Sequence, residues 1–264
     1  MTDVQERSND AERDVYFNAV ADLVREAGNR ALSYYGTKVT VEEKENGTPV
    51  TIADRRAEQL AREWLEKRFP GDGIVGEEFG MVRPDARRRW FIDPIDATKS
   101  FVRGVPLWGT LVGVVEDDEV IAGAAYYPGV NEILVAAPGK GCWWNGRQSY
   151  VSPTSSLESA LVVTTDDRFA ERPERRQRWN ELAGRAGITR TWGDCFGYLL
   201  VATGRAEVMV DDVVAPWDAV AFYPIITEAG GVFTSWNGDR TAFGDDVIAT
   251  NGALDAVVRG ILTP

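Results

Sequence analysis

The segment that most constrains this chain is an apolar strand that ends in two carboxylates. Residues 90–92 are Trp-Phe-Ile, Asp93 and Asp96 follow with only two residues between them, and Ala97–Thr98 indicates the start of a helix. Two like charges at the end of a buried strand repel each other and resist removal from water. A divalent cation offsets both effects, so the pattern predicts a metal site where this strand meets the helix.

Further oxygen donors stand at the ends of other expected elements. Glu77 and Glu78 follow a short apolar strand, Asp54 opens an expected helix, and Asp218 lies in the first turn of another. Each has a simpler interpretation, because paired acids often form a solvated turn and acids in a first helical turn compensate the helix dipole. Asp96 can equally be a helix N-cap. Together, however, these carboxylates match what a phosphatase with two or three metal ions requires.

Composition excludes several kinds of chemistry. The chain has no histidine, which rules out a Ser-His-Asp triad, a Cys-His pair and histidine-bearing zinc sites. Cys142 and Cys195 form no Cys-x-x-Cys motif and are expected to be free buried thiols in a reducing cytosol. The net charge of −12 argues against binding to nucleic acid or anionic membranes.

No apolar run approaches the ~20 residues that a membrane span needs. Residues 1–14 are polar and charged, so we expect them to form a frayed leader to the first helix and not a signal peptide. These features predict a soluble, cytoplasmic protein.

Hydrophobic periodicity predicts a mixed α/β architecture. Helical spacing indicates helices over residues 15–31 and 54–65, and residues 38–51 are expected to form a loop or a short hairpin. Three apolar or alternating segments separated by turn residues then indicate an antiparallel meander. These segments are residues 107–115, 120–127 and 132–137.

A polar stretch at residues 152–156 is the expected boundary between two domains. Residues 1–151 would carry helices, an antiparallel sheet and most of the metal ligands. Residues 152–264 would form a smaller α/β unit that supplies Asp218 and the substrate-side residues. The elements expected there are strands at 161–163, 206–210, 231–233 and 247–250, helices at 173–185, 193–202 and 217–229, and a short final helix.

Five ordered motifs resemble those of the inositol monophosphatase family, which comprises Mg²⁺-dependent, lithium-sensitive phosphatases. They are Val50-Thr-Ile-Ala-Asp54, Gly76-Glu-Glu78, Asp93-Pro-Ile-Asp-Ala-Thr98, Pro216-Trp-Asp218 and Glu228-Ala-Gly-Gly231. The similarity spans nearly the whole chain. It implies an α-β-α-β-α layered sandwich and a homodimer. Residues 98–110, 193–204 and 207–211 are most similar to the histidinol-phosphatase branch of the family.

The resemblance also implies a role for each motif residue. A first Mg²⁺ would be held by Glu77, Asp93 and the Ile95 carbonyl, and a second by Asp93, Asp96 and Asp218. Thr98 and Asp54, together with Glu77, would serve catalysis by polarising the attacking water. The backbone N–H groups of Ala97 and Thr98 would hold the phosphate. Glu78 and Lys44 would support the site, where Glu78 could assist a third, weaker ion.

Two positions depart from the family pattern. Ala97 stands where relatives usually have glycine, so its backbone amide is well placed for phosphate if φ is negative. A positive φ would cost on the order of 1 kcal/mol. Asn46, in the segment Lys44-x-x-Gly47, stands where relatives commonly have aspartate. These departures motivate one alternative, a catalytically weak family member with a binding or regulatory role.

The sequence also bears on the substrate, a small phosphomonoester. Asp194 and Asp211 match positions beside the leaving group in relatives, and two carboxylates there favour a cationic alcohol over a neutral polyol. We therefore expect hydrolysis of L-histidinol phosphate. The alternative is an inositol-1-phosphate or broad sugar-phosphate phosphatase, which would follow if these carboxylates only cap a helix or turn.

Overall fold

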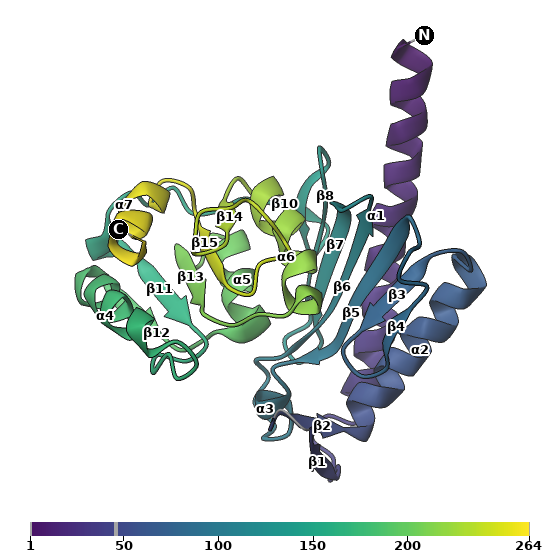
Figure 1. Cartoon of the computed structure of the whole chain (residues 1–264), viewed down its shortest axis with the longest axis horizontal. Coiled ribbons are helices and arrows are strands. Elements are labelled where there is room, and N and C mark those ends of the chain that lie inside the picture. The colour runs from purple at the N-terminus through teal and green to yellow at the C-terminus, as the bar shows by residue number, and fades with distance from the viewer. Residues whose placement is uncertain (1, 45–46, 264) are drawn as a thin grey trace.

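Five layers, α-β-α-β-α, make up the fold, as the family resemblance predicted (Figure 1). The computed structural model describes residues 2–44 and 47–263. An eight-stranded sheet lies between two helical layers, and a five-stranded sheet lies between the second helical layer and a third.

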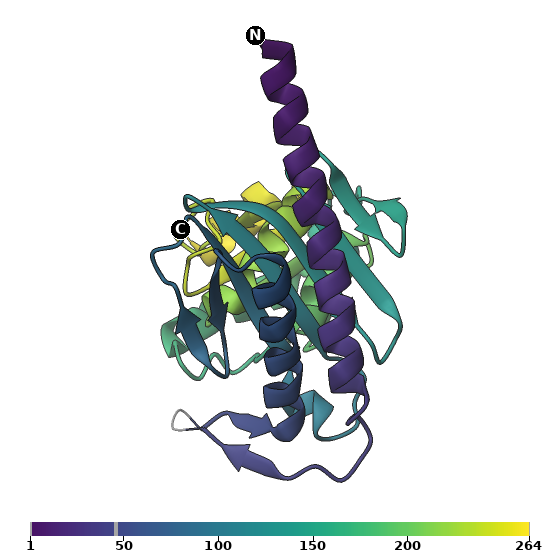
Figure 2. The ribbon, with the colours of Figure 1, turned by 90° about the vertical axis from the view of Figure 1, so that its right-hand side faces the viewer.

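The first layer consists of two helices that lie side by side across the large sheet (Figure 2). They are α1 (Thr2–Leu32) and α2 (Ile52–Arg68). In α1, Val20, Leu23, Val24 and Ala27 are fully buried, which is the helical period that the sequence predicted. The expected leader over residues 1–14 is wrong for the backbone of residues 2–14, because the helix already begins at Thr2.

The large sheet contains the predicted meander and a parallel pair at one side. Its order is β10-β9-β8-β7-β6-β5-β3-β4, and only β3 and β5 pair in parallel within it. The strands are β3 (Gly73–Gly76), β4 (Gly80–Val82), β5 (Arg88–Asp96), β6 (Gly109–Glu116), β7 (Glu119–Tyr127), β8 (Glu132–Ala137), β9 (Gly141–Trp144) and β10 (Arg147–Ser149).

The middle layer joins the two sheets. It consists of α5 (Asp194–Ala202) and α6 (Pro216–Glu228), whose apolar side chains are buried all round. In α6, Val220 and Phe222 are fully buried, and the helix contacts β5 to β8 on one side and β14 on the other. A helix that is apolar on every face belongs between two sheets, which explains why neither helix has a polar stripe.

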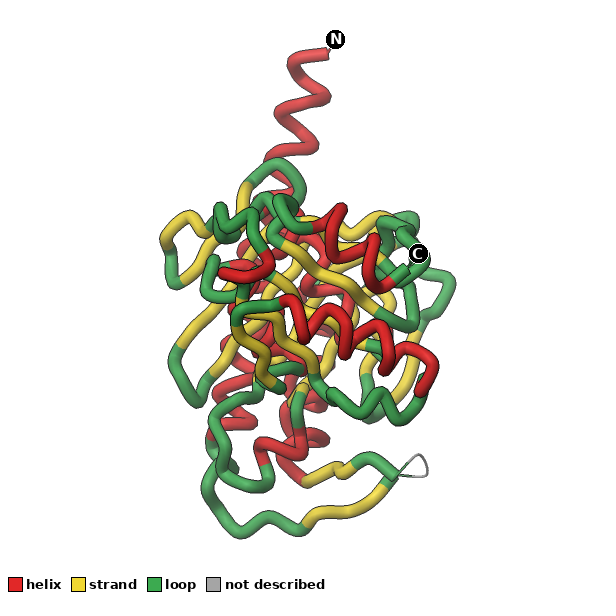
Figure 3. Tube along the Cα trace, turned by 90° about the vertical axis from the view of Figure 1, so that its left-hand side faces the viewer, coloured by secondary structure: helices red, strands yellow, loops and turns green. Residues whose placement is uncertain are grey.

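The second sheet has the order β12-β11-β13-β15-β14 and is covered on its outer face by α4 and α7, in the foreground of Figure 3. Ser152–Ser156 lie between the two sheets in sequence, and the division into two domains at this stretch remains a prediction. The elements are β11 (Leu161–Thr164), β12 (Ile188–Arg190), β13 (Val208–Asp211), β14 (Val232–Thr234), β15 (Val247–Thr250), α4 (Arg176–Arg185), α7 (Asp255–Leu262) and the 3₁₀ turns Leu157–Ser159 and Pro173–Arg175.

Three local details differ from or complete the sequence-based expectation. The helix α2 starts at Ile52, because Thr51 is its N-cap and Asp54 completes a capping box. The expected hairpin is confirmed by the antiparallel pairing of β1 (Val41–Glu43) with β2 (Pro49–Thr51). Asn46 lies outside the described residues, so its predicted effect remains a prediction.

Close packing of α6 on the large sheet gives a testable prediction at Gly123 in β7. A Cβ at this position would lie 2.3 Å from the Ala221 carbonyl oxygen, which backbone cannot accommodate without a shift. We expect Gly123→Ala to reduce the free energy of unfolding by about 1–3 kcal/mol in urea titrations. Gly184→Ala is the matched control, since a Cβ in this part of α4 meets nothing within 4 Å and should stabilise the helix by about 0.5–1 kcal/mol. Equal stability of both variants would contradict this packing argument.

Candidate active site

The site begins where two parallel strands end at the same edge of the large sheet. Gly76 of β3 pairs with Ile92 of β5, and the Glu77 N–H donates to the Ile92 carbonyl oxygen at 3.2 Å. Glu77 and Asp93 therefore leave adjacent strands at the same level. The strand β5 continues through Pro94 to Asp96, and a shift of register against β6 between Asp93 and Asp96 accommodates this continuation. The predicted strand of residues 90–92 was thus too short.

A third carboxylate reaches this edge from the middle layer. Asp218 lies in the first turn of α6 and accepts a hydrogen bond from the Ala215 N–H at 2.8 Å. Oxygens of Asp93, Asp96 and Asp218 all lie within 4.8 Å of one another, and the charge of Glu77 is near enough to add to burial in raising the pKa of Asp93. Asp218 therefore caps its helix and also faces the cluster, so the two interpretations of this residue are compatible.

The electrostatics of this cluster favour either protonation or a bound cation. Burial, followed by repulsion from neighbouring carboxylates, raises the pKa of Asp93 and of Asp96 well above the ordinary value. Burial is also the first cause that raises the pKa of Asp218, to about 7. Buried carboxylates at such spacing stay ionised only when positive charge compensates them, and a set of oxygen donors suits a hard divalent ion such as Mg²⁺.

A cavity of about 180 Å³ opens over these carboxylates. Its wall combines β5, the start of α3 (Thr98–Phe101), the start of α5 and the β1–β2 hairpin. Among the described residues that line it, Lys99 is the single cation. The lining residues are Thr48, Pro49, Glu77, Asp93, Ile95, Asp96, Ala97, Thr98, Lys99, Asp194 and Asp218.

Thr98 connects the wall of the cavity to α2. Its Oγ1 lies 3.0 Å from the Ile95 carbonyl oxygen and 3.5 Å from Oδ1 of Asp54. Asp54 is fully buried and also accepts hydrogen bonds from the backbone and hydroxyl of Thr51. Burial raises the pKa of Asp54, which these hydrogen bonds partly offset. A proton accepted by the Thr98 hydroxyl therefore has a nearby buried acceptor.

Two residues of the cavity wall have left-handed backbone without being glycine. Ala97 has φ 66°, and Asp194 has φ 48°. Asp96 is not the N-cap of α3, because Ala97 occupies that position and Asp96 accepts a hydrogen bond from the Cys195 N–H at 2.8 Å. Ala97 therefore has the positive φ that costs free energy for a residue with a side chain. Non-glycine residues in this region cost about 1–3 kcal/mol and concentrate at functional sites.

The two substrate-side carboxylates occupy different places. Asp194 lines the cavity, and its N–H donates to Oγ1 of Thr165 at 2.7 Å. Asp211 is not among the lining residues. It is buried, is hydrogen-bonded by Thr165, and accepts a hydrogen bond from the Tyr198 hydroxyl at 2.8 Å. Burial raises the pKa of Asp211 to about 7. Asp211 therefore contacts the residue that holds Asp194 in place.

The hairpin contributes a cation behind the cluster. Nζ of Lys44 lies 2.7 Å from Glu77 and 2.6 Å from Glu78. Burial alone would lower the pKa of Lys44, but hydrogen bonds to both glutamates outweigh it and raise the pKa. Lys44 thus ties the β1–β2 hairpin to the turn that carries Glu77.

Comparison with known proteins places this geometry in a family. Residues 12–261 match the profile of the inositol monophosphatase family. The chain belongs to the inositol monophosphatase family. Members of this family are metal-dependent phosphatases, and this chain is accordingly a phosphoric monoester hydrolase.

The phosphatase is 38% identical to a histidinol-phosphatase of Chlorobaculum parvum over 235 residues, which is 88% of this chain and 91% of that protein. It is 34% identical to a fructose-1,6-bisphosphatase/inositol-1-monophosphatase of Thermotoga maritima, covering 90% and 92% of the two chains. An inositol monophosphatase structure from Zymomonas mobilis superimposes with a TM-score of 0.83 at 30% identity, covering 95% and 97%.

The sequence analysis of this phosphatase did not identify two residues at the site, Lys99 and Thr165, because neither is acidic. Lys99 directly follows Thr98 in the third motif, so its place in the cavity could have been inferred from the helix start alone. Thr165 had no such signal, because its contact with Asp194 joins residues 29 positions apart. Cys142 and Cys195 are free and buried, as predicted.

The left-handed conformation of Ala97 gives a second prediction. Since the backbone already has φ 66°, Ala97→Gly should relieve strain and raise the free energy of unfolding by about 0.5–1 kcal/mol. Phosphatase activity should stay within about twofold, because the position of the amide does not change. Ala183→Gly in α4 is the control and should lower the free energy of unfolding by about 1 kcal/mol. A tenfold gain in kcat for Ala97→Gly would instead mean that Ala97 impairs the site.

Proposed function

We propose that this phosphatase is Mg²⁺-dependent and hydrolyses L-histidinol phosphate to L-histidinol and phosphate. The observation that supports this choice of substrate is the position of Asp194. Its carboxylate lies in the cavity wall, and its backbone has a strained conformation. A cationic amino alcohol would pair with this carboxylate, whereas a neutral polyol would leave it desolvated and unpaired. Similarity to a protein named histidinol-phosphatase supports the same substrate.

The donor set would hold two Mg²⁺ ions, and Glu78 would assist a third. Glu77, Asp93 and the Ile95 carbonyl would hold one ion, and Asp93, Asp96 and Asp218 would hold the other. When bound, Mg²⁺ lowers the pKa of water and offsets negative charge on the phosphate. The support for this assignment is the donor set itself, in which oxygens of buried Asp93 and of half-buried Asp96 and Asp218 lie within 4.8 Å of one another.

The remaining residues would act on the water and the phosphate. A water that donates to Oγ1 of Thr98 would be aligned for attack, and the hydroxyl would pass its proton toward Asp54, 3.5 Å away. The N–H groups of Ala97 and Thr98, at the start of α3, would bind the phosphate oxygens. Lys99 would add positive charge at the rim of the cavity, where the phosphate enters.

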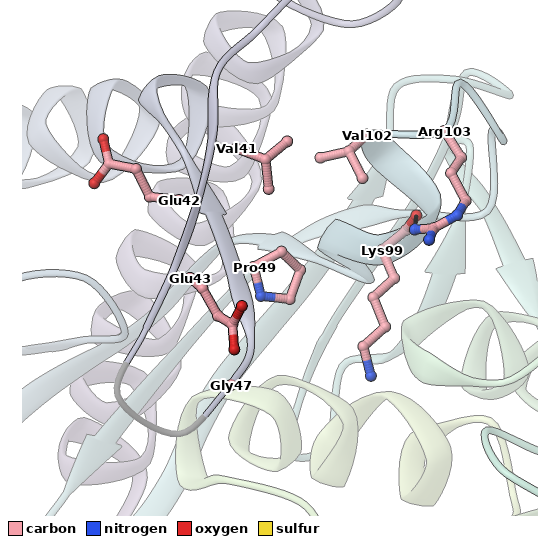
Figure 4. A pocket seen from close by; sticks show the side chains of 8 residues that line it. All are labelled: Val41, Glu42, Glu43, Gly47, Pro49, Lys99, Val102 and Arg103. Atoms are coloured by element: carbon pink, nitrogen blue, oxygen red, sulfur yellow. Dashed lines mark hydrogen bonds between the residues drawn. The ribbon is translucent and has the colours of Figure 1, made fainter.

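A broader sugar-phosphate specificity is the alternative, and one observation favours it. A second cavity of about 560 Å³ adjoins the site and shares Pro49 and Lys99 with it. In Figure 4 the side chains of Lys99, in α3, and of Arg103, in the turn that follows α3, lie on one side of this cavity, opposite the β1–β2 hairpin. Two cations beside the site would suit a substrate with a second anionic group.

The proposal extends to cell compartment and assembly. Two free buried thiols suit a reducing cytoplasm, and the family resemblance implies a homodimer. Among the described residues, no helix is long and apolar enough to cross a membrane. Light scattering coupled to gel filtration would measure the oligomeric state.

A third prediction tests the metal site. Asp93→Asn removes the carboxylate shared by both ions, so kcat/KM for any phosphomonoester should fall by at least ~10³-fold, about 4 kcal/mol. The rise in melting temperature that Mg²⁺ causes in the wild-type protein should also disappear. Asp167→Asn, on an exposed loop, is the control and should change neither quantity. Retention of activity by Asp93→Asn would refute the ligand assignment. Absence of phosphate release from the wild-type protein would favour a binding or regulatory role.

A fourth prediction tests the substrate. Steady-state phosphate release should show a kcat/KM at least ~100-fold higher for L-histidinol phosphate than for inositol-1-phosphate, about 2.7 kcal/mol of discrimination. Asp194→Asn should reduce this preference below tenfold by lowering only the histidinol phosphate value. Asparagine also tolerates the left-handed conformation, so the fold of this turn is preserved. Comparable wild-type rates on both substrates would identify a generalist.

A further inference from the structure

The helix α2 presents a second buried carboxylate one turn after Asp54. Glu58 is fully buried and does not line the cavity, but its carboxylate is hydrogen-bonded by the turn that carries Glu77. A buried carboxylate is retained only where it is well hydrogen-bonded. The hydrogen-bond partners of Glu58 therefore indicate what this carboxylate holds in place.

These partners enclose Glu77 from both sides. The N–H groups of Glu78 and Phe79 donate to the Glu58 carboxylate at 2.7 and 3.2 Å. On the other side, Gly76 approaches so closely that a Cβ there would lie 1.9 Å from Oε1 of Glu58. Only glycine at position 76 permits this contact. The residue before Glu77 and the two residues after it thus rest on one carboxylate.

Arg62 completes the arrangement from the next turn of α2. Its Nε donates to Oε1 of Glu58 at 2.8 Å, and its Nη2 donates to the Gly80 carbonyl oxygen. The charge of Glu58 is therefore compensated without a metal, and the β3–β4 turn is fixed to the helix through both Glu58 and Arg62. The side chain of Glu77 lines the cavity and is also ion-paired with Lys44 from the hairpin.

We propose that Glu58 is a positioning residue for the metal site, because it fixes the turn that presents Glu77 beside Asp93. This inference rests on the proposed metal-dependent hydrolysis. Glu58 sets how tightly the first ion is held, and it takes no part in proton transfer. Asp54 and Glu58, four residues apart on one face of α2, then align two parts of the site from a single rigid helix.

The fifth prediction measures metal binding directly. Isothermal titration of Mg²⁺ into Glu58→Gln should give a Kd 10–100-fold higher than that of the wild-type protein, as for other residues that orient metal ligands. Glutamine has the same shape, but its NH₂ group opposes one of the two N–H donors. At saturating Mg²⁺, kcat should return to within about threefold of the wild-type value. Glu58→Asp should give an intermediate Kd, since it keeps the charge but shortens the reach.

Controls separate this inference from a general loss of stability. Glu63→Gln changes an exposed glutamate of the same helix and should leave the Kd unchanged. If Glu58→Gln fails to fold, the double variant Glu58→Gln/Arg62→Met, which leaves no buried charge unpaired, takes its place. A Kd within twofold of the wild-type value, with or without a lower melting temperature, would overturn the positioning role. Absence of Mg²⁺ binding to the wild-type protein would instead refute the proposed function.

Discussion

Mutual repulsion between buried carboxylates is the constraint on which the rest of this structure depends. Asp93, Asp96 and Asp218 converge within 4.8 Å, with the charge of Glu77 nearby. Such a group stays ionised only with a compensating cation, and the fold holds its oxygens at fixed positions. Each carboxylate is accordingly anchored through backbone hydrogen bonds or by its place at the end of a strand or helix.

The layered architecture provides this rigidity. Parallel pairing of β3 with β5 sets Glu77 level with Asp93, and α6, packed between the two sheets, brings Asp218 to the same edge. On the opposite face of the large sheet, α2 fixes Asp54 against Thr98 and Glu58 against the Glu77 turn. Residues from the layers on both faces of the large sheet therefore contribute to the site at one edge of this sheet.

Two strained backbone positions lie in the wall of the cavity where the substrate would bind. Ala97 and Asp194 both have left-handed backbone, and neither is glycine. The close approach of Gly193 to Thr165, together with the hydrogen bond from Asp194 to Thr165, holds the second turn in place. A preformed turn loses less entropy when a ligand binds, so this strain contributes to pre-organisation of the cavity wall.

The sequence by itself determined the layered fold and the chemistry of the site. Acidic residues at the ends of apolar segments indicated oxygen ligands, and ordered motifs indicated the family, because these signals are local and each motif is contiguous. Tertiary structure alone decided the φ of Ala97, the position of Asp211 outside the cavity wall, and the hydrogen bonds of Glu58. These depend on contacts between residues up to tens of positions apart, such as Glu58 with Glu78 or Asp194 with Thr165. Periodicity reports which face of an element is buried, but it does not report what that face meets.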